Sequence, residues 1–347
     1  MKARNKRHAS FVQTLVYYDG PILALLQDRQ GNNIVAFAVS DEVEGFDEPF
    51  IAKSTSPKLL SDYLRQRIDL SYLMRERRGG EPYMFDWAKF EDEVQLIPAE
   101  AVVENVSELL PSPGFFARNH TEQFKGIKVS SLTSHSYRID GRWSANDFSR
   151  FYAKLDDLYS LFSYLGEVRD ASGPLAQNLV EKIAKYPWQR GGSYLGFFKD
   201  IAAGAKEDYP LQVSKIKYAS PGVIEVKGVY SSLTQIDALI GIFDSKKSDL
   251  STLYRELHGI LDRDGVLGTD NKDFSNKATE RMAVERSDSL LAGLGVADPE
   301  AVKDACQNHF VPYAKIALAI YRRGEDFHRF HAEGRMRLPS EVSSSGR

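Results

Sequence analysis

A proline-containing stretch without hydrophobic periodicity divides this chain into two parts of different character. Residues 105–125, "NVSELLPSPGFFARNHTEQFK", follow neither the two-residue alternation of a strand nor the 3.6-residue repeat of a helix. Short apolar runs between turn residues precede this stretch, and longer helical repeats follow it. The 347 residues suffice for two hydrophobic cores. We therefore predict two domains with a boundary in this stretch.

The first part has the pattern of an antiparallel sheet. Apolar runs at residues 22–26 and 34–39 flank "QDRQGNN", in which Gly31 and Asn32 suit the positive φ angles of a tight hairpin. Further short runs bounded by turn residues follow, and one helix interrupts them. We predict a small β-rich domain over residues 11–110.

The second part alternates strands with long amphipathic helices. Ser144 and Asp147 have the spacing of a capping box in front of a strongly aromatic helical stripe. Two strand patterns then surround an Ala-Ser-Pro-Gly corner, and helical repeats dominate after it. We predict a larger α+β domain over residues 125–337, helical toward its end, and a polar disordered tail over residues 338–347. The fold class of the chain is therefore α+β.

The composition limits the classes of protein to consider. Hydrophobic residues make up 42% of the chain and charged residues 27%, a balance that is ordinary for globular proteins. Cys306 is the single cysteine, so an intramolecular disulfide and a cysteine-based zinc site within one chain are excluded. No run of about 18 apolar residues is present. We expect a cytoplasmic protein that does not act at a membrane.

The segment "GVIEVKGV" raises the hypothesis of a nuclease. On a strand, Glu225 and Lys227 leave the same face, where the carboxylate could bind Mg²⁺ and the amine could position a water molecule. Such sites need a second acidic ligand, and Asp208 is the nearest candidate. The alternative is an ordinary half-buried strand, with Ile224 and Val226 packed inward.

The segment "FHRFH" raises the hypothesis of a metal site. His328 and His331 stand three residues apart, which lets both reach one ion from a helix, and Glu325 and Glu333 could assist. The spacing differs from His-Glu-x-x-His, the zinc motif of metalloproteases. The alternative is an exposed or helix-terminal histidine pair without a ligand.

Basic residues at the start of the chain suggest a contact with nucleic acid. We predict that residues 1–10 form a basic flexible tail whose phosphate contacts would weaken steeply with salt. Its basic residues are Lys2, Arg4, Lys6 and Arg7. The formal net charge of the whole chain is −3, so any nucleic-acid contact has to be local.

The first part of the chain also resembles an uncharacterised family of bacterial proteins. The resemblance rests on "YYDGP", Tyr17 to Pro21, and on "LLSDYLRQRIDLSYL", Leu59 to Leu73. It implies a bacterial or phage-related source and a small β-rich domain, and it supplies no catalytic residues. Proteins of this kind look like components of multi-gene bacterial systems, with phage defence as the suggested setting.

These observations favour a non-enzymatic interaction or sensor subunit, with another protein as its partner and without a cofactor. One alternative is a divalent-metal nuclease that uses Asp208, Glu225, Lys227 and Mg²⁺. A second alternative is a nucleic-acid-binding protein without cleavage.

Overall fold

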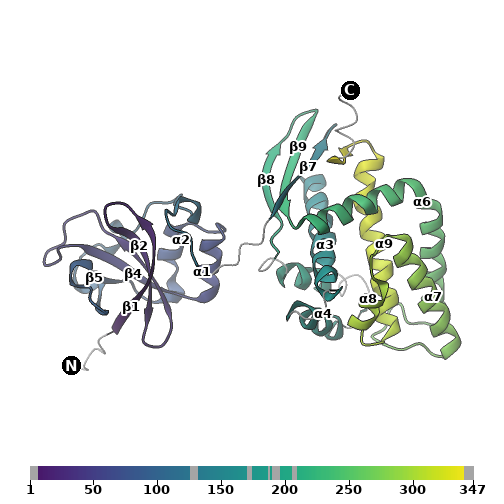
Figure 1. The fold of residues 1–347 in the computed structure, drawn as a ribbon, viewed down its shortest axis with the longest axis horizontal. Coiled ribbons are helices and arrows are strands. Elements are labelled where there is room, and N and C mark those ends of the chain that lie inside the picture. Colours follow the sequence, from purple (N-terminus) through teal and green to yellow (C-terminus); the bar gives the residue numbers. More distant parts are fainter. Residues whose placement is uncertain are drawn as a thin grey trace. The chain divides into compact units, whose positions relative to one another are not determined.

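The computed structural model describes residues 7–125, 132–169, 174–186, 188–189, 196–204 and 209–339. The chain divides into two compact units, residues 1–128 and 129–347 (Figure 1). The first unit is an antiparallel β-barrel with two short helices, and the second combines a four-stranded sheet with long helices. The predicted α+β class, with a β-rich domain before a larger helical one, is confirmed.

The first unit is a closed barrel in which each strand pairs with the next and the sixth returns to the first. Its strands are β1 Arg7–Tyr17, β2 Pro21–Asp28, β3 Asn33–Ala38, β4 Pro49–Thr55, β5 Tyr83–Asp86 and β6 Glu93–Pro98. Successive side chains point to opposite sides of a strand, and in β2 both sides are buried. Leu23 and Leu25 pack with the two helices, while Ala24 and Leu26 belong to the second core cluster of the barrel.

The helices of the first unit are α1 Pro57–Leu64 and α2 Leu70–Arg75. The side chain of Ser56 accepts a hydrogen bond from the backbone N–H of Leu59, and Pro57 occupies the first turn, where its missing N–H costs nothing. Gln66, at a φ of 60°, separates the two helices. Short 3₁₀ turns complete this unit at Arg77–Gly79, Trp87–Lys89, Ala99–Ala101, Val106–Glu108 and Ala117–Asn119.

Two predicted bounds of the first domain need correction. Strand β1 begins at Arg7, so the predicted tail over residues 1–10 overlaps the barrel, in which Ala9 is buried. At the other end, the unit extends beyond residue 110, because Phe115 and Phe124 pack against the core formed by the barrel and its helices. Hydrogen bonds from this segment also reach β1, where the backbone N–H of Tyr17 donates to Thr121.

The second unit contains a sheet in the order β10-β7-β9-β8. Its strands are β7 Thr133–Ile139, β8 Gln212–Lys217, β9 Gly222–Gly228 and β10 Met336–Arg337. Its helices are α3 Ala145–Arg169, α4 Pro174–Lys185, α6 Tyr230–Arg263, α7 Lys277–Gly293, α8 Pro299–Ala305 and α9 Phe310–Ala332, and residues 196–204 are also helical. The predicted capping box forms: the N–H of Asp147 donates to Ser144 Oγ, and the N–H of Ser144 donates to Asp147 Oδ2.

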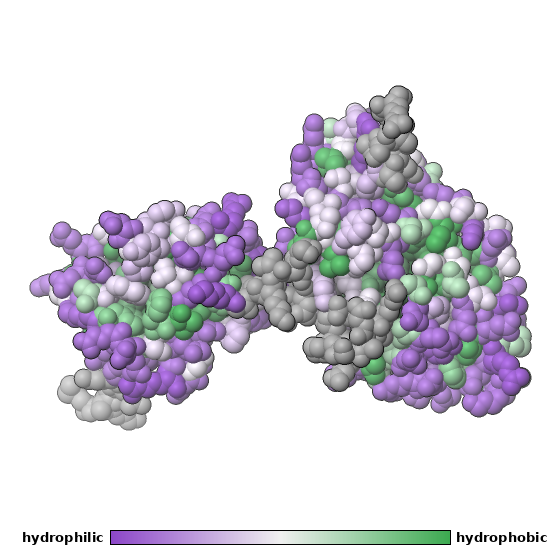
Figure 2. Space-filling model, viewed as in Figure 1, coloured by the Kyte–Doolittle hydropathy of each residue, from purple (hydrophilic) through white to green (hydrophobic). Residues whose placement is uncertain are grey.

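The core of the second unit lies between one face of the sheet and the helices. Tyr137 and Ile224 are fully buried on that face, and the Tyr137 ring packs edge-on against Phe151 of α3 and Phe327 of α9. Helices α3, α6 and α9 pack against one another, and α7 packs on α6 and α9 (Figure 1). Figure 2 shows hydrophilic residues over most of the visible face of each unit, with smaller hydrophobic patches between them.

The end of the chain is described only in part. Leu338 is buried, so the predicted tail does not begin at residue 338, and residues 340–347 lie outside the described residues. None of the described helices is long and apolar enough to cross a membrane.

Candidate metal centre

The close approach of α6 and α9 places polar side chains of the two helices together. At Gly324 on α9, an added Cβ would stand 2.7 Å from the Phe243 ring and 3.0 Å from Leu239 of α6. A side chain here would have to displace the Phe243 ring, so the contact favours glycine. Asp244 follows Phe243 along α6, and His328 lies one helical turn beyond Gly324 on α9.

Asp244, His328 and His331 form a compact group at this contact. Their ligand atoms all lie within 4.8 Å of one another, and within the described part of the chain no other group of three His, Cys, Asp or Glu side chains is arranged to share an ion. His328 Nε2 lies 2.7 Å from Asp244 Oδ1, and His331 Nδ1 lies 3.2 Å from Asp244 Oδ2. The predicted pair His328 and His331 therefore lies together and gains a carboxylate from a second helix.

The distances between the ligand atoms can be compared with those around a bound ion. Metal–nitrogen bonds of about 2.0 Å in a tetrahedral site place neighbouring ligand atoms about 3.3 Å apart. The 3.2 Å between His331 and Asp244 is close to this value, whereas the 2.7 Å between His328 and Asp244 is the distance of a hydrogen bond. An ion would therefore have to replace this hydrogen bond and move the two side chains slightly apart.

Burial differs among the three side chains. Only 4% of the His328 side chain is exposed, and its ring stacks on Phe243 with 5.4 Å between the ring centres. Its Nε2 atom faces Asp244, so this is the nitrogen that a shared ion would use. The Asp244 side chain is 42% exposed, so the group opens to solvent on the α6 side.

The donor set indicates which ions the group could hold. Imidazole nitrogens with one carboxylate suit Zn²⁺ and divalent iron, cobalt or nickel, whereas Mg²⁺ and Ca²⁺ prefer oxygen ligands throughout. Asp244 also lies two residues before Lys246, where the backbone leaves the helical conformation with a φ of −130° and kinks α6. The group therefore lies at the bend of the longest helix described.

The predicted helper residues do not join the group. Glu325 interacts with Tyr321, and Glu333 lies 3.4 Å from Arg335. Sequence reasoning missed Asp244, which is 84 residues away from His328. A signal was present, because Asp244 stands four residues after Ile240 and so borders the apolar stripe of α6, a position where a carboxylate can face a neighbouring helix.

The residues of the nuclease hypothesis occupy the outer face of the sheet. Glu225 accepts hydrogen bonds from the hydroxyls of Ser134, at 2.8 Å, and Ser214, at 2.9 Å. Lys227 projects from the same face two residues further along β9. Asp208, the proposed second acidic ligand, lies outside the described residues.

Of the four basic residues of the predicted tail, the structure describes only Arg7. Its guanidinium lies 2.7 Å from Asp28 in the barrel and over the ring of Tyr83, so it is engaged within the first unit. Lys2, Arg4 and Lys6 lie outside the described residues.

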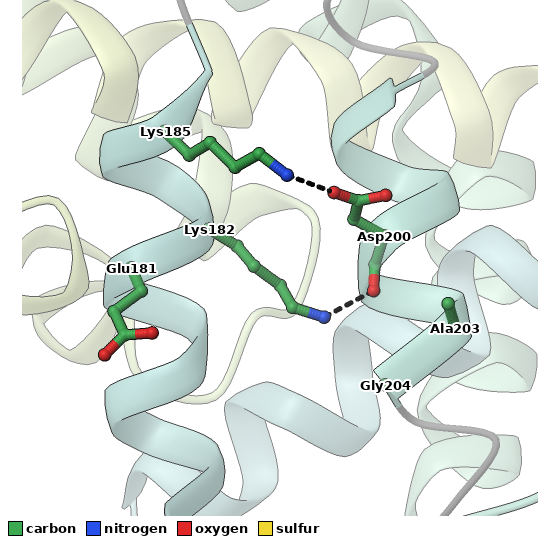
Figure 3. A pocket seen from close by; sticks show the side chains of 6 residues that line it. All are labelled: Glu181, Lys182, Lys185, Asp200, Ala203 and Gly204. Carbon is green, nitrogen blue, oxygen red and sulfur yellow. Dashed lines mark hydrogen bonds and ion pairs between the residues drawn. The ribbon is translucent and has the colours of Figure 1, made fainter. Parts of the chain in front are cut away.

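A cavity of about 360 Å³ lies between α4 and the helix at residues 196–204 (Figure 3). Lys182 and Lys185 point from α4 toward Asp200, where Lys182 donates to the backbone carbonyl and Lys185 Nζ lies 3.2 Å from the carboxylate. The hydroxyl of Tyr186 donates to the same carboxylate. Because these polar groups pair with one another, we interpret the cavity as a structural junction between two helices.

Comparisons with protein-family models, with curated proteins and with solved structures found no match.

Proposed function

We propose that this protein is a metal-binding interaction or sensor subunit in which Asp244, His328 and His331 hold one transition-metal ion. The observation that carries the proposal is the convergence of the three donors from two helices. The alternative is a group without an ion, in which Asp244 is held by hydrogen bonds such as the one to His328. The meeting of two histidines at one carboxylate favours the metal interpretation, because two imidazoles and a carboxylate form a donor set that binds zinc in other proteins.

A bound ion would couple metal occupancy to the shape of the second unit. It would join Asp244 on α6 to both histidines on α9, directly beside the kink at Lys246. An ion that binds only this arrangement stabilises it in proportion to the logarithm of the metal concentration. A bend that is fixed by metal is a suitable basis for a sensor.

The partly exposed Asp244 side chain leaves coordination positions open to a water molecule or to a donor from a partner protein. Three protein ligands and a water molecule are also typical of catalytic zinc sites. Cavities lined by other described residues, such as the one beside α4, do not include the three donors. We therefore propose binding in preference to catalysis. A role in a bacterial multi-protein system, with phage defence as its setting, stays a prediction.

The test is a calorimetric titration of the metal-free full-length chain with Zn²⁺ and with Co²⁺. We expect one ion per chain, and loss of binding in His328→Gln, His331→Gln and Asp244→Asn. At a free concentration of about 100 times Kd, the ion should stabilise the fold by about 2.7 kcal/mol. In a unit of this size, that stabilisation corresponds to a rise in melting temperature of about 5 to 10 °C.

His309→Gln is the matched control. His309 Nδ1 lies 3.4 Å from Asp273, so this pair resembles one half of the site but lacks a second histidine. The control should keep full metal binding. Absence of binding in the wild-type chain, or binding that survives all three ligand substitutions, would overturn the proposal.

A further inference from the structure

The four strands of the second unit carry an unusual surplus of positive charge. Their basic side chains are Arg138, Lys215, Lys217, Lys227 and Arg337, and their single carboxylate is Glu225. The chain as a whole has a formal net charge of −3, so this surplus is local.

The strand register places all of these side chains on one face. Residues directly opposite each other in an antiparallel pair project to the same side, so each row across the sheet shares a face. The rows are Arg337, Arg138, Val223 and Lys217, then Ser136, Glu225 and Lys215, and then Ser134, Lys227 and Gln212. Together these residues define the basic face.

The basic face points away from the helices. The alternate residues of the central strands, such as Tyr137, Ile224 and Val226, are buried against the helical core. Lys215 and Lys227 are exposed on the opposite side, as are Lys217 and Arg337.

The charges on the basic face are poorly balanced by the protein itself. Arg138 and Arg337 are direct cross-strand partners, and like charges in such positions repel each other. Glu225 is held by Ser134 and Ser214, and these hydrogen bonds, with the nearby Lys215 and Lys227, keep the pKa of its carboxyl below the ordinary value. Arg138 and Arg337 act instead on Asp140, just beyond β7, and help to lower the pKa of its carboxyl. A bound polyanion would relieve the remaining repulsion.

We infer that the basic face binds the phosphate backbone of a nucleic acid. Side chains two residues apart on a strand are about 6.8 Å apart, and neighbouring strands are about 4.8 Å apart, so the cations form a grid that can follow a charged chain. The hydroxyl of Ser136, in the middle row, adds a hydrogen-bond donor of the kind that contacts phosphates. This inference is independent of the metal centre.

The composition of the basic face favours nucleic acid over an acidic protein. Protein interfaces usually have a centre of aromatic or other large apolar anchors, and here Val223 is the only apolar residue in the three rows. A phosphate backbone needs no such centre. Because the rows contain no aromatic side chain for base stacking, binding should be independent of sequence.

The test is fluorescence anisotropy of a labelled single-stranded oligonucleotide of mixed sequence, titrated with the full-length chain at several salt concentrations. The probe variant is Lys215→Ala/Lys217→Ala/Lys227→Ala. Removal of three phosphate contacts should reduce the slope of log affinity against log salt by about 2. The matched control, Lys58→Ala/Lys199→Ala/Lys272→Ala, removes three exposed lysines outside the sheet and should keep the wild-type slope.

Glu225→Gln supplies a test in the opposite direction. It removes the one carboxylate of the basic face at nearly constant shape, so affinity should rise and the salt dependence should steepen. The inference is overturned if the wild-type chain does not bind the oligonucleotide at 50 mM salt, or if the probe and control variants behave alike. Binding of polyglutamate in place of the oligonucleotide would also overturn it, and would identify an acidic protein as the partner.

Discussion

The buried amine of Lys315 donates a hydrogen bond to the backbone carbonyl of Trp188, 127 residues away, with 2.8 Å between the two atoms. It donates a second bond to the carbonyl of Thr269 at 2.9 Å. The side chain is fully buried within α9. Burial lowers the pKa of Lys315 to about 8, and Asp270 opposes this shift only in part. The second unit therefore keeps a cation in its core at neutral pH.

This burial predicts a pH dependence of stability. The unfolded lysine has a pKa of about 10.4, so between pH 8 and 10 the unfolded chain binds a proton that the folded chain has released. The free energy of unfolding should therefore rise by up to about 2 kcal/mol between pH 7.5 and 9.5. Urea denaturation should show this rise in the wild-type chain and in the exposed-site control Lys199→Met. An equal rise in Lys315→Met would contradict the prediction.

The contact at Gly324 predicts a steric effect. Gly324→Ala places a methyl group against Phe243 and Leu239, so the helices must move apart or repack, at a cost of about 1 to 3 kcal/mol. The affinity for the metal ion should also fall in Gly324→Ala, because the same contact positions Asp244. Gly241→Ala on α6 is the control, since an added Cβ there meets nothing within 4 Å, and it should stabilise the helix by up to about 1 kcal/mol. Equal thermal stability of the two variants would contradict the proposed contact.

Asp28, at the hairpin between β2 and β3, predicts that part of the stability of the first unit is lost in acid. Burial raises the pKa of Asp28, but hydrogen bonds from Asn32, Arg7 and Gln30 outweigh it and lower the pKa to about 2. The resulting stability, about 2 kcal/mol, is present above pH 4 and is lost as the pH falls toward 2. Asp28→Asn should therefore be less stable than the wild type at pH 7, with a difference that shrinks below pH 4.

Asp19→Asn is the control for the Asp28 prediction. Asp19 is an exposed corner between β1 and β2 with a φ of 48°, a conformation that asparagine also tolerates. Denaturation of this variant should match that of the wild type at both pH values.

The surroundings of Glu225 predict that it does not support a nuclease. Its carboxylate is held by two serine hydroxyls, and the four strands provide no second acidic residue. We expect Glu225→Ala to leave unchanged any cleavage of plasmid DNA or single-stranded RNA measured with Mg²⁺ or Mn²⁺. Robust cleavage by the wild type that disappears in this variant would restore the nuclease hypothesis.

Local signals in the sequence predicted local structure well. Ser56 and Pro57 identified the start of α1, and Ser144 with Asp147 identified the start of α3, because capping depends on residues three positions apart. The strands β2 and β3 followed from their apolar runs and from the turn between them.

Features that depend on residues far apart in the sequence could not be predicted from such local signals. The pairing of β1 with β6 closes the barrel, and it joins residues more than 80 positions apart, such as Arg7 and Leu96. Asp244 meets the predicted histidines close to the point where Gly324 lets α6 and α9 approach each other, 84 residues apart in the sequence. The basic face likewise becomes visible only when the register aligns three separate segments of the chain with β10.

The two sheets also differ in when they can form during synthesis. The barrel needs only residues up to Pro98, so its last strand pairing becomes available early. In the second unit, β7 at Thr133–Ile139 pairs with β10 at Met336–Arg337, a partner that the ribosome adds about 200 residues later. Because domains generally fold as units while the chain is being made, the barrel can close early, whereas the strand that completes the second sheet and adds Arg337 to the basic face is among the last parts to be made.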